Sequence, residues 1–135
     1  MALRYSVAIR NARLDVVEST IGASAQLVIL TGSEPASCAA AETGTRLAVM
    51  TLPADWAAAA SAGTKALLGT WQDASADATG TAAYFRIYDS AGTTCGVQGT
   101  VTASGGGGQL QLASTAITSG QPVQITSFTL TAGNP

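Results

Sequence analysis

Three aspartates, Asp73, Asp77 and Asp89, are the first residues whose type and spacing suggest chemistry. Carboxylate oxygens bind calcium, and paired carboxylates catalyse glycoside hydrolysis. The spacing matches no EF-hand loop, and no clustered third ligand accompanies Asp73 and Asp77. A sugar site would also need a cleft lined by exposed aromatics and amides, and the chain has only two tryptophans and three tyrosines. We therefore expect neither a metal site nor a glycosidase site.

The absence of histidine restricts the remaining chemistry further. It removes the commonest general base at neutral pH and excludes Ser-His-Asp and Cys-His catalysis. Four glycines, Gly105 to Gly108, could suggest a phosphate cradle, but the residues after them are strand-like and include no lysine, so a mobile hairpin tip is favoured. We expect no catalytic residue, no cofactor and no small-molecule substrate, and hence a protein that is not an enzyme.

Two cysteines, Cys38 and Cys95, could pair in principle. A single pair in 135 residues is far below the density of a disulfide scaffold, and free cysteine commonly behaves as a small buried hydrophobe. We expect both to remain thiols.

The charge balance limits the partners. Six basic and eight acidic residues give a net charge of −2, with no basic run that could neutralise a phosphate backbone, so nucleic acid is not expected. Only 10% of residues are charged, a surface better suited to contact with protein than to isolation in water. No signal peptide and no apolar run of about 20 residues is evident, so we expect a cytoplasmically made, soluble chain without a membrane partner.

The elements that would position a site begin with a hairpin over residues 83–104. Its first arm alternates Ala83, Phe85 and Ile87 with Tyr84, Arg86 and Tyr88, and a turn with Asp89 and Gly92 follows. This pattern predicts a half-buried sheet. Tyrosine and arginine are enriched in interface cores, so the Tyr84, Arg86 and Tyr88 face is a candidate protein interface.

A helix is predicted over residues 3–21, with Gly22 as its C-terminal cap. One stripe of this helix carries Leu3, Val7, Arg10, Leu14, Val17 and Ile21. Arginines near its N-terminus and acids near its C-terminus oppose the helix macrodipole, so the helix must dock onto something. It either covers its own sheet or reaches another subunit, and in the second case Leu3, Val7, Leu14 and Val17 are interface residues.

Further short strands are predicted over 26–31, 46–52, 66–71, 109–113 and 123–132, and the segment 32–45 between the first two is predicted to be an exposed loop. Residues 55–61 form a helical turn or cross an edge, with Trp56 plugging the end of the sandwich. The fold class is mainly β, an antiparallel β-sandwich or jelly roll with an N-terminal α-helix. We divide the chain into the helix, residues 1–22, and the β-sandwich domain, residues 23–135.

The last strand has a split pattern. Val123 and Ile125 share one parity, whereas Phe128 and Leu130 share the other. A regular strand would point one pair away from the core, so we predict a β-bulge near Thr126 and Ser127 that turns both pairs inward.

Three stretches, SADATGTAAYFRIYDSAGTTCGVQGTV (75–101), QLVILTGSEPASC (26–38) and SFTLTAGNP (127–135), resemble small structural proteins that tailed bacteriophages and prophages encode beside the major capsid protein. The resemblance implies a β-sandwich or jelly roll without catalytic residues. It also implies a head decoration or cement protein that clamps neighbouring capsomers of the major capsid protein. The expected location is the exterior of the virion capsid, after assembly in the host bacterial cytoplasm, and a homodimer or homotrimer is expected.

Two other functions remain open. A phage tail or neck component would use the same sandwich for ring contacts, and a host-adhesion or carbohydrate-binding module would bind glycans. The position of the protein on purified particles separates the first from a decoration protein, and glycan binding by the isolated domain would favour the second.

Overall fold

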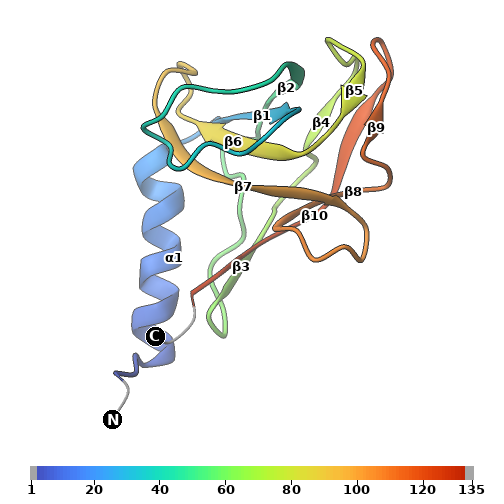
Figure 1. Ribbon diagram of the computed structural model, residues 1–135. Coiled ribbons are helices and arrows are strands. Elements are labelled where there is room, and N and C mark those ends of the chain that lie inside the picture. Colours follow the sequence, from blue (N-terminus) through green and yellow to red (C-terminus); the bar gives the residue numbers. More distant parts are fainter. Residues whose placement is uncertain (1–2, 133–135) are drawn as a thin grey trace.

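The computed structural model describes residues 3–132 and consists of one N-terminal helix and a curled, sandwich-like β-structure (Figure 1). The elements are α1 (Val7–Ile21), β1 (Gln26–Leu30), β2 (Arg46–Thr51), β3 (Thr64–Ala66), β4 (Gln72–Asp73), β5 (Gly80–Thr81), β6 (Tyr84–Tyr88), β7 (Cys95–Ala103), β8 (Leu110–Leu112), β9 (Ala116–Ile117) and β10 (Val123–Thr131). The mainly β class with an N-terminal helix is confirmed.

The large sheet has the strand order β2-β1-β6-β7-β8-β10-β3, and β4 also pairs with β10. Strands β5 and β9 form a separate two-stranded sheet. All pairs are antiparallel except β7 and β8, which run parallel with Val101 opposite Leu110. The fold is therefore mixed in strand direction, whereas the sequence predicted an antiparallel arrangement.

The glycines at 105–108 make this parallel pair possible. The predicted hairpin tip is wrong, because residues 104–109 lead the chain back beside the end of β7 and not into an antiparallel partner. Gly105 and Gly107 have φ values of +84° and +85°, which favour glycine. The Gly108 amide donates to Thr102 Oγ1 at 3.0 Å, so the loop is anchored to the strand that it leaves.

The predicted β-bulge in the last strand is confirmed. Ile125 pairs with Leu112 and Ser127 pairs with Gln111, so Thr126 is the extra residue of β10. The bulge lets residues of both parities reach the main core: Val123, Ile125 and Phe128 are buried, and Leu130 packs against them.

Aromatic side chains fill the centre of that core. Trp71 lies between Trp56 and Phe128, with ring centroids 6.0 Å and 4.8 Å apart, and Phe85 meets Phe128 edge-on. The indole of Trp56 donates to the carbonyl of Gly22 at 3.0 Å. Trp56 therefore belongs to the core and ties it to the end of the helix.

The helix is shorter than predicted. Ser6 caps its N-terminus by accepting a hydrogen bond from the Ile9 amide, so the first turn begins at Val7 and not at Leu3. Gly22 closes the helix, as predicted, and its amide donates to the carbonyl of Glu18. Figure 1 shows the C-terminal end of α1 next to β7, with the rest of the helix extending beside β3 and the end of β10.

Candidate functional site

The Tyr84, Arg86 and Tyr88 face is buried in the structure. These side chains are only 1%, 2% and 6% exposed, although the sequence predicted that they form an open interface. The physical reason is the connection between β1 and β2, residues 32–45: it is a largely exposed loop, as the sequence predicted, but its inner side packs over this face. Beneath the loop, Tyr84 and Tyr88 of this face form a second apolar cluster with Val28 and Leu30.

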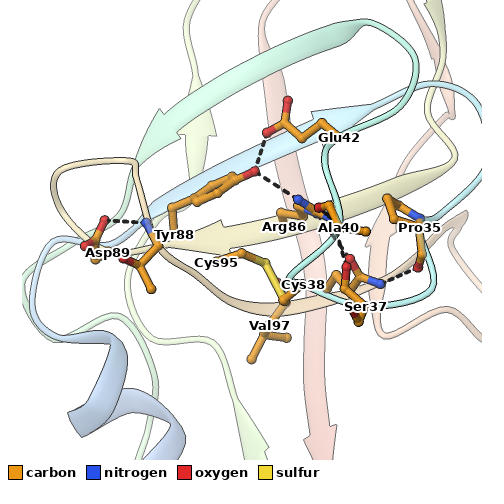
Figure 2. The surroundings of a disulfide bond; sticks show 12 residues. Pro35, Ser37, Cys38, Ala40, Glu42, Arg86, Tyr88, Asp89, Cys95 and Val97 are labelled. Carbon is orange, nitrogen blue, oxygen red and sulfur yellow. Dashed lines mark hydrogen bonds between the residues drawn. A yellow bond between two sulfur atoms is a disulfide. The ribbon is translucent and has the colours of Figure 1, made fainter.

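Arg86 holds the 32–45 loop in place (Figure 2). Its Nη2 donates to the carbonyl of Ser37 at 3.1 Å and to that of Ala40 at 2.8 Å. Its Nε donates to Gln98 Oε1 at 3.1 Å, and the amide of Gln98 in turn donates to the carbonyl of Pro35 at 2.6 Å. The guanidinium thus gives the Ala40 carbonyl its donor and gives the Ser37 carbonyl a second one beside the Ala40 amide.

Both tyrosines of this face also bind the loop. Tyr84 donates its hydroxyl to the carbonyl of Thr43 at 2.7 Å and accepts from the Thr43 amide at 2.9 Å. Tyr88 donates its hydroxyl to Glu42, which binds Arg46 through two hydrogen bonds of 2.9 Å and 2.7 Å. Hydrogen bonds from Arg46 hold the pKa of Glu42 below its ordinary value, whereas burial, together with the bond to Glu42, raises the pKa of Tyr88.

A disulfide joins Cys38 in the 32–45 loop to Cys95 at the start of β7 (Figure 2). The expectation of two thiols is therefore wrong. The two Cα atoms lie 5.4 Å apart, a separation that a disulfide spans without backbone movement. Their sequence separation of 57 residues hides this proximity from any reading of the sequence alone.

The second candidate surface is the helix. It docks onto its own domain through a polar network centred on Lys65 of β3, whose side chain is 1% exposed. The ammonium binds Asp15 at 2.8 Å and Glu18 at 3.0 Å, and it donates to the carbonyl of Ala58 at 2.9 Å. Burial acts to lower the pKa of Lys65, but its hydrogen bonds to the two carboxylates outweigh burial and raise that pKa above its ordinary value.

The predicted helix stripe is divided between two environments. Leu14 and Ile21 are buried and Val17 packs against the core, so this part covers the chain's own sheet. Leu3 and Val7, by contrast, are 61% and 50% exposed. Of the predicted interface residues, the structure therefore leaves only these two available to a partner.

The sequence reading missed the opposite side of the helix. Ile9 and Val16 are 51% and 57% exposed, and the exposed Ala12 lies between them at spacings of three and four residues. This spacing places the three on one helix face, which we call the outer helix face. The same spacing is visible in the sequence, but it was obscured by the stripe on the docked side.

The basic residues of the chain differ in whether an acidic or carbonyl group of the chain binds them. Within residues 3–132, four cations have internal acceptors: Arg10 donates to the Ala132 carbonyl, and Arg46, Lys65 and Arg86 are bound as described. The two others, Arg4 and Arg13, are exposed on the N-terminal segment and the helix, with Arg13 lying 5.2 Å from the ring centroid of Tyr5. Neither forms a salt bridge with a described residue.

A pocket of about 420 Å³ opens beside the disulfide. Its lining includes both cysteines, Glu42, Arg46 and Tyr88, as well as Arg86. The lining groups are bound to one another, since Glu42 engages both Arg46 and Tyr88, and Arg86 is occupied by the loop carbonyls.

The three aspartates of the sequence analysis have local structural contacts. Asp89 accepts from the amides of Thr93 and Thr94 and so closes the β6–β7 turn. Asp73 accepts from the Val49 amide at 3.2 Å, and the main chain of Asp77 bonds to Leu47. Across the part of the chain that the structure describes, no three Cys, Asp or Glu side chains are grouped to hold a metal ion.

Comparisons with protein-family models, with curated proteins and with solved structures find no match to this chain. Among residues 3–132, the single helix is neither long nor apolar enough to cross a bilayer.

Proposed function

We propose that this chain is a structural protein of a bacteriophage particle, a head decoration or cement protein that binds between capsomers of the major capsid protein. The observation that carries a protein-binding role is the outer helix face. Of the five large hydrophobic side chains exposed among the described residues, Ile9 and Val16 lie on this face, and Leu3 and Val7 lie at the N-terminal end of the stripe on the other side of the helix. Assignment to a phage head comes from the sequence resemblance.

The way in which the helix is held supports this role. Lys65 and its two carboxylates fix α1 against β3, and Asn11 accepts a hydrogen bond from the Gly63 amide at 2.9 Å. A partner would therefore meet a helix that is already ordered, which reduces the entropy cost of binding. Arg4 and Arg13 beside the apolar residues favour a partner surface that carries carboxylates.

Many weak contacts repeated around a symmetric shell give strong attachment without any catalytic group. Such a role needs no catalytic group, and the polar clusters around Arg86 and Lys65 bind the chain's own loop and helix. We propose, as an expectation of the same model, that the free protein is a homodimer or homotrimer, which light scattering coupled to size-exclusion chromatography would measure.

The test uses phage particles stripped of this protein. The double variant Ile9→Asp, Val16→Asp alters only exposed positions, whereas deletion of residues 1–21 would also remove the buried Leu14 and Ile21. We expect the variant to lose occupancy on the heads and to leave the genome-release temperature at the stripped value. The control Thr118→Asp, at an exposed position after β9, should bind as the wild type does. Equal occupancy by both variants would contradict the proposal.

The same particles separate the other functions. Label along the tail or at the neck would replace head decoration by a tail or neck role. A carbohydrate-binding role has less support, because Trp56, Trp71, Tyr84 and Tyr88 are all buried and offer no exposed ring on which a sugar could stack. Binding on a glycan array by the isolated protein would nevertheless establish it.

A further inference from the structure

The 32–45 loop has few main-chain attachments to the sheet that it covers. Within the described residues, main-chain hydrogen bonds hold it at its base, where the Thr31 amide donates to the Thr45 carbonyl at 3.0 Å. The Ala40 amide bonds within the loop, to Ser37. Beyond the base, the attachments come from side chains of β6 and β7, from Arg46 of β2, which binds Glu42, and from the disulfide.

The alanine side chains of this loop bury little apolar surface of their own. Ala36, Ala39, Ala40 and Ala41 are exposed, and Cys38 is half-buried. The apolar surface that closure of the loop removes from water therefore belongs mainly to the rings of Tyr84 and Tyr88 on the sheet. The covalent link through Cys38 is therefore a principal restraint on the middle of the loop.

The disulfide is also accessible to a reductant. Cys38 and Cys95 are both half-buried, and both line the pocket of about 420 Å³. Exchange requires a thiolate to approach one sulfur atom, and a disulfide at a pocket wall allows that approach whereas one in a packed core does not.

We propose that the Cys38–Cys95 disulfide is a redox-controlled latch that keeps the 32–45 loop closed over the Tyr84, Arg86 and Tyr88 face. A thiolate of a dithiol reductant attacks one sulfur of the disulfide, which releases one cysteine as a thiolate and leaves the other in a mixed disulfide with the reductant. The second thiol of the reductant then attacks its own sulfur in the mixed disulfide and releases the second cysteine. The protein gains two electrons and two protons as two thiols, and the reductant becomes a disulfide. The loop then opens while the rest of the sheet stays folded. This inference goes beyond the proposed function and does not depend on it.

The full chain offers two matched sites for testing the latch with a glutamate-specific protease. Glu42 lies in the loop, whereas Glu18 lies in α1 and binds Lys65. We expect dithiothreitol to accelerate cleavage after Glu42 by about tenfold or more, and cleavage after Glu18 to remain much slower than cleavage after Glu42 in the reduced protein, because the loop opens locally whereas Glu18 is exposed only by unfolding of the helix. Hydrogen exchange gives a second measurement: on opening, the Thr43 amide loses its bond to Tyr84 and should lose its protection, while β1 and β10 amides should remain strongly protected in the reduced protein.

The variant Cys38→Ser, Cys95→Ser separates loss of the bond from other effects of the reductant. It should be cleaved after Glu42 at the fast rate with and without dithiothreitol. Unchanged cleavage and Thr43 exchange in the reduced wild type would overturn the proposal, because the loop would then be held by its hydrogen bonds alone. Cleavage after Glu18 as fast as cleavage after Glu42 in the reduced protein would overturn it as well, because reduction would then unfold the whole chain.

Discussion

At the scale of single residues, Arg86 has the largest structural consequence. It is a buried guanidinium without a carboxylate in direct contact, and its charge is instead solvated by the carbonyls of Ser37 and Ala40 and by Gln98. Burying a charge is costly unless such polar partners surround it. Arg86 and the 32–45 loop are therefore interdependent: the loop shields the charge, and the charge orders the loop.

Substitution of Arg86 tests this interdependence. Arg86→Met keeps an unbranched side chain but removes every donor, so the loop carbonyls and Gln98 lose their partners. We expect the free energy of unfolding to fall by about 2–4 kcal/mol. Arg4→Met, at an exposed position, should change it by less than about 0.5 kcal/mol. Urea denaturation measures both variants, and similar midpoints for the two would contradict a structural role for Arg86.

Glu42 gives a pH-dependent prediction at the same scale. Its pKa in the folded protein is lowered from 4.5, mainly by hydrogen bonds from Arg46, so its ionised form stabilises the fold above that pH. The contribution is lost as pH falls through the lowered folded pKa. Because the pair is partly exposed, we expect Glu42→Gln to cost at most about 1 kcal/mol at pH 6.

The measurement for Glu42 is the difference in melting temperature between the wild type and Glu42→Gln at several pH values. This difference should shrink toward zero as the pH falls well below 4.5, since the wild-type side chain is then also neutral. Comparison with the variant cancels the titration of the other carboxylates. A difference that is as large in acid as at pH 6 would mean that the charge of Glu42 is not what stabilises the loop.

At the scale of elements, the helix presents two apolar sides that have different tasks. The side with Leu14 and Ile21 is buried against the domain, and the outer helix face with Ile9 and Val16 is exposed. A helix with apolar residues on both sides has no single amphipathic stripe, so periodicity alone does not tell which side docks. The polar contacts of Lys65 with Asp15 and Glu18 identify the docked side.

Two alanine substitutions distinguish these sides. Leu14→Ala leaves a cavity beneath the helix and should lower the free energy of unfolding by about 2–4 kcal/mol. Val16→Ala removes exposed methyl groups only and should change it by less than about 0.5 kcal/mol in the free protein. Thermal or urea unfolding compares them, and a larger effect at Val16 would mean that the outer helix face is buried in solution by another molecule.

At the scale of the whole molecule, the disulfide constrains the largest part of the chain. It closes a segment of 57 residues that includes β2 to β6. In the chain-entropy account, such a cross-link stabilises the fold by restricting the unfolded state, by about 4 kcal/mol for this length. This stabilisation is separate from its local effect on the 32–45 loop.

The variant Cys38→Ser, Cys95→Ser should therefore unfold at lower urea concentration than the oxidised wild type, with a free energy of unfolding lower by about 4 kcal/mol. Reduced wild type should resemble the variant. A loss below about 1 kcal/mol would show that residual structure or strain offsets the chain-entropy term.

The sequence by itself determined the local features of this protein. The hairpin over 83–104, the cap at Gly22 and the bulge at Thr126 follow from alternation, glycine chemistry and strand parity, which depend on neighbouring residues along the chain. Only the tertiary structure decided what covers each face. Whether Tyr84, Arg86 and Tyr88 meet solvent depends on a loop 40 residues or more away, and the pairing of Cys38 with Cys95 spans 57 residues. Such contacts are set by the packing of the whole chain, which no local pattern encodes.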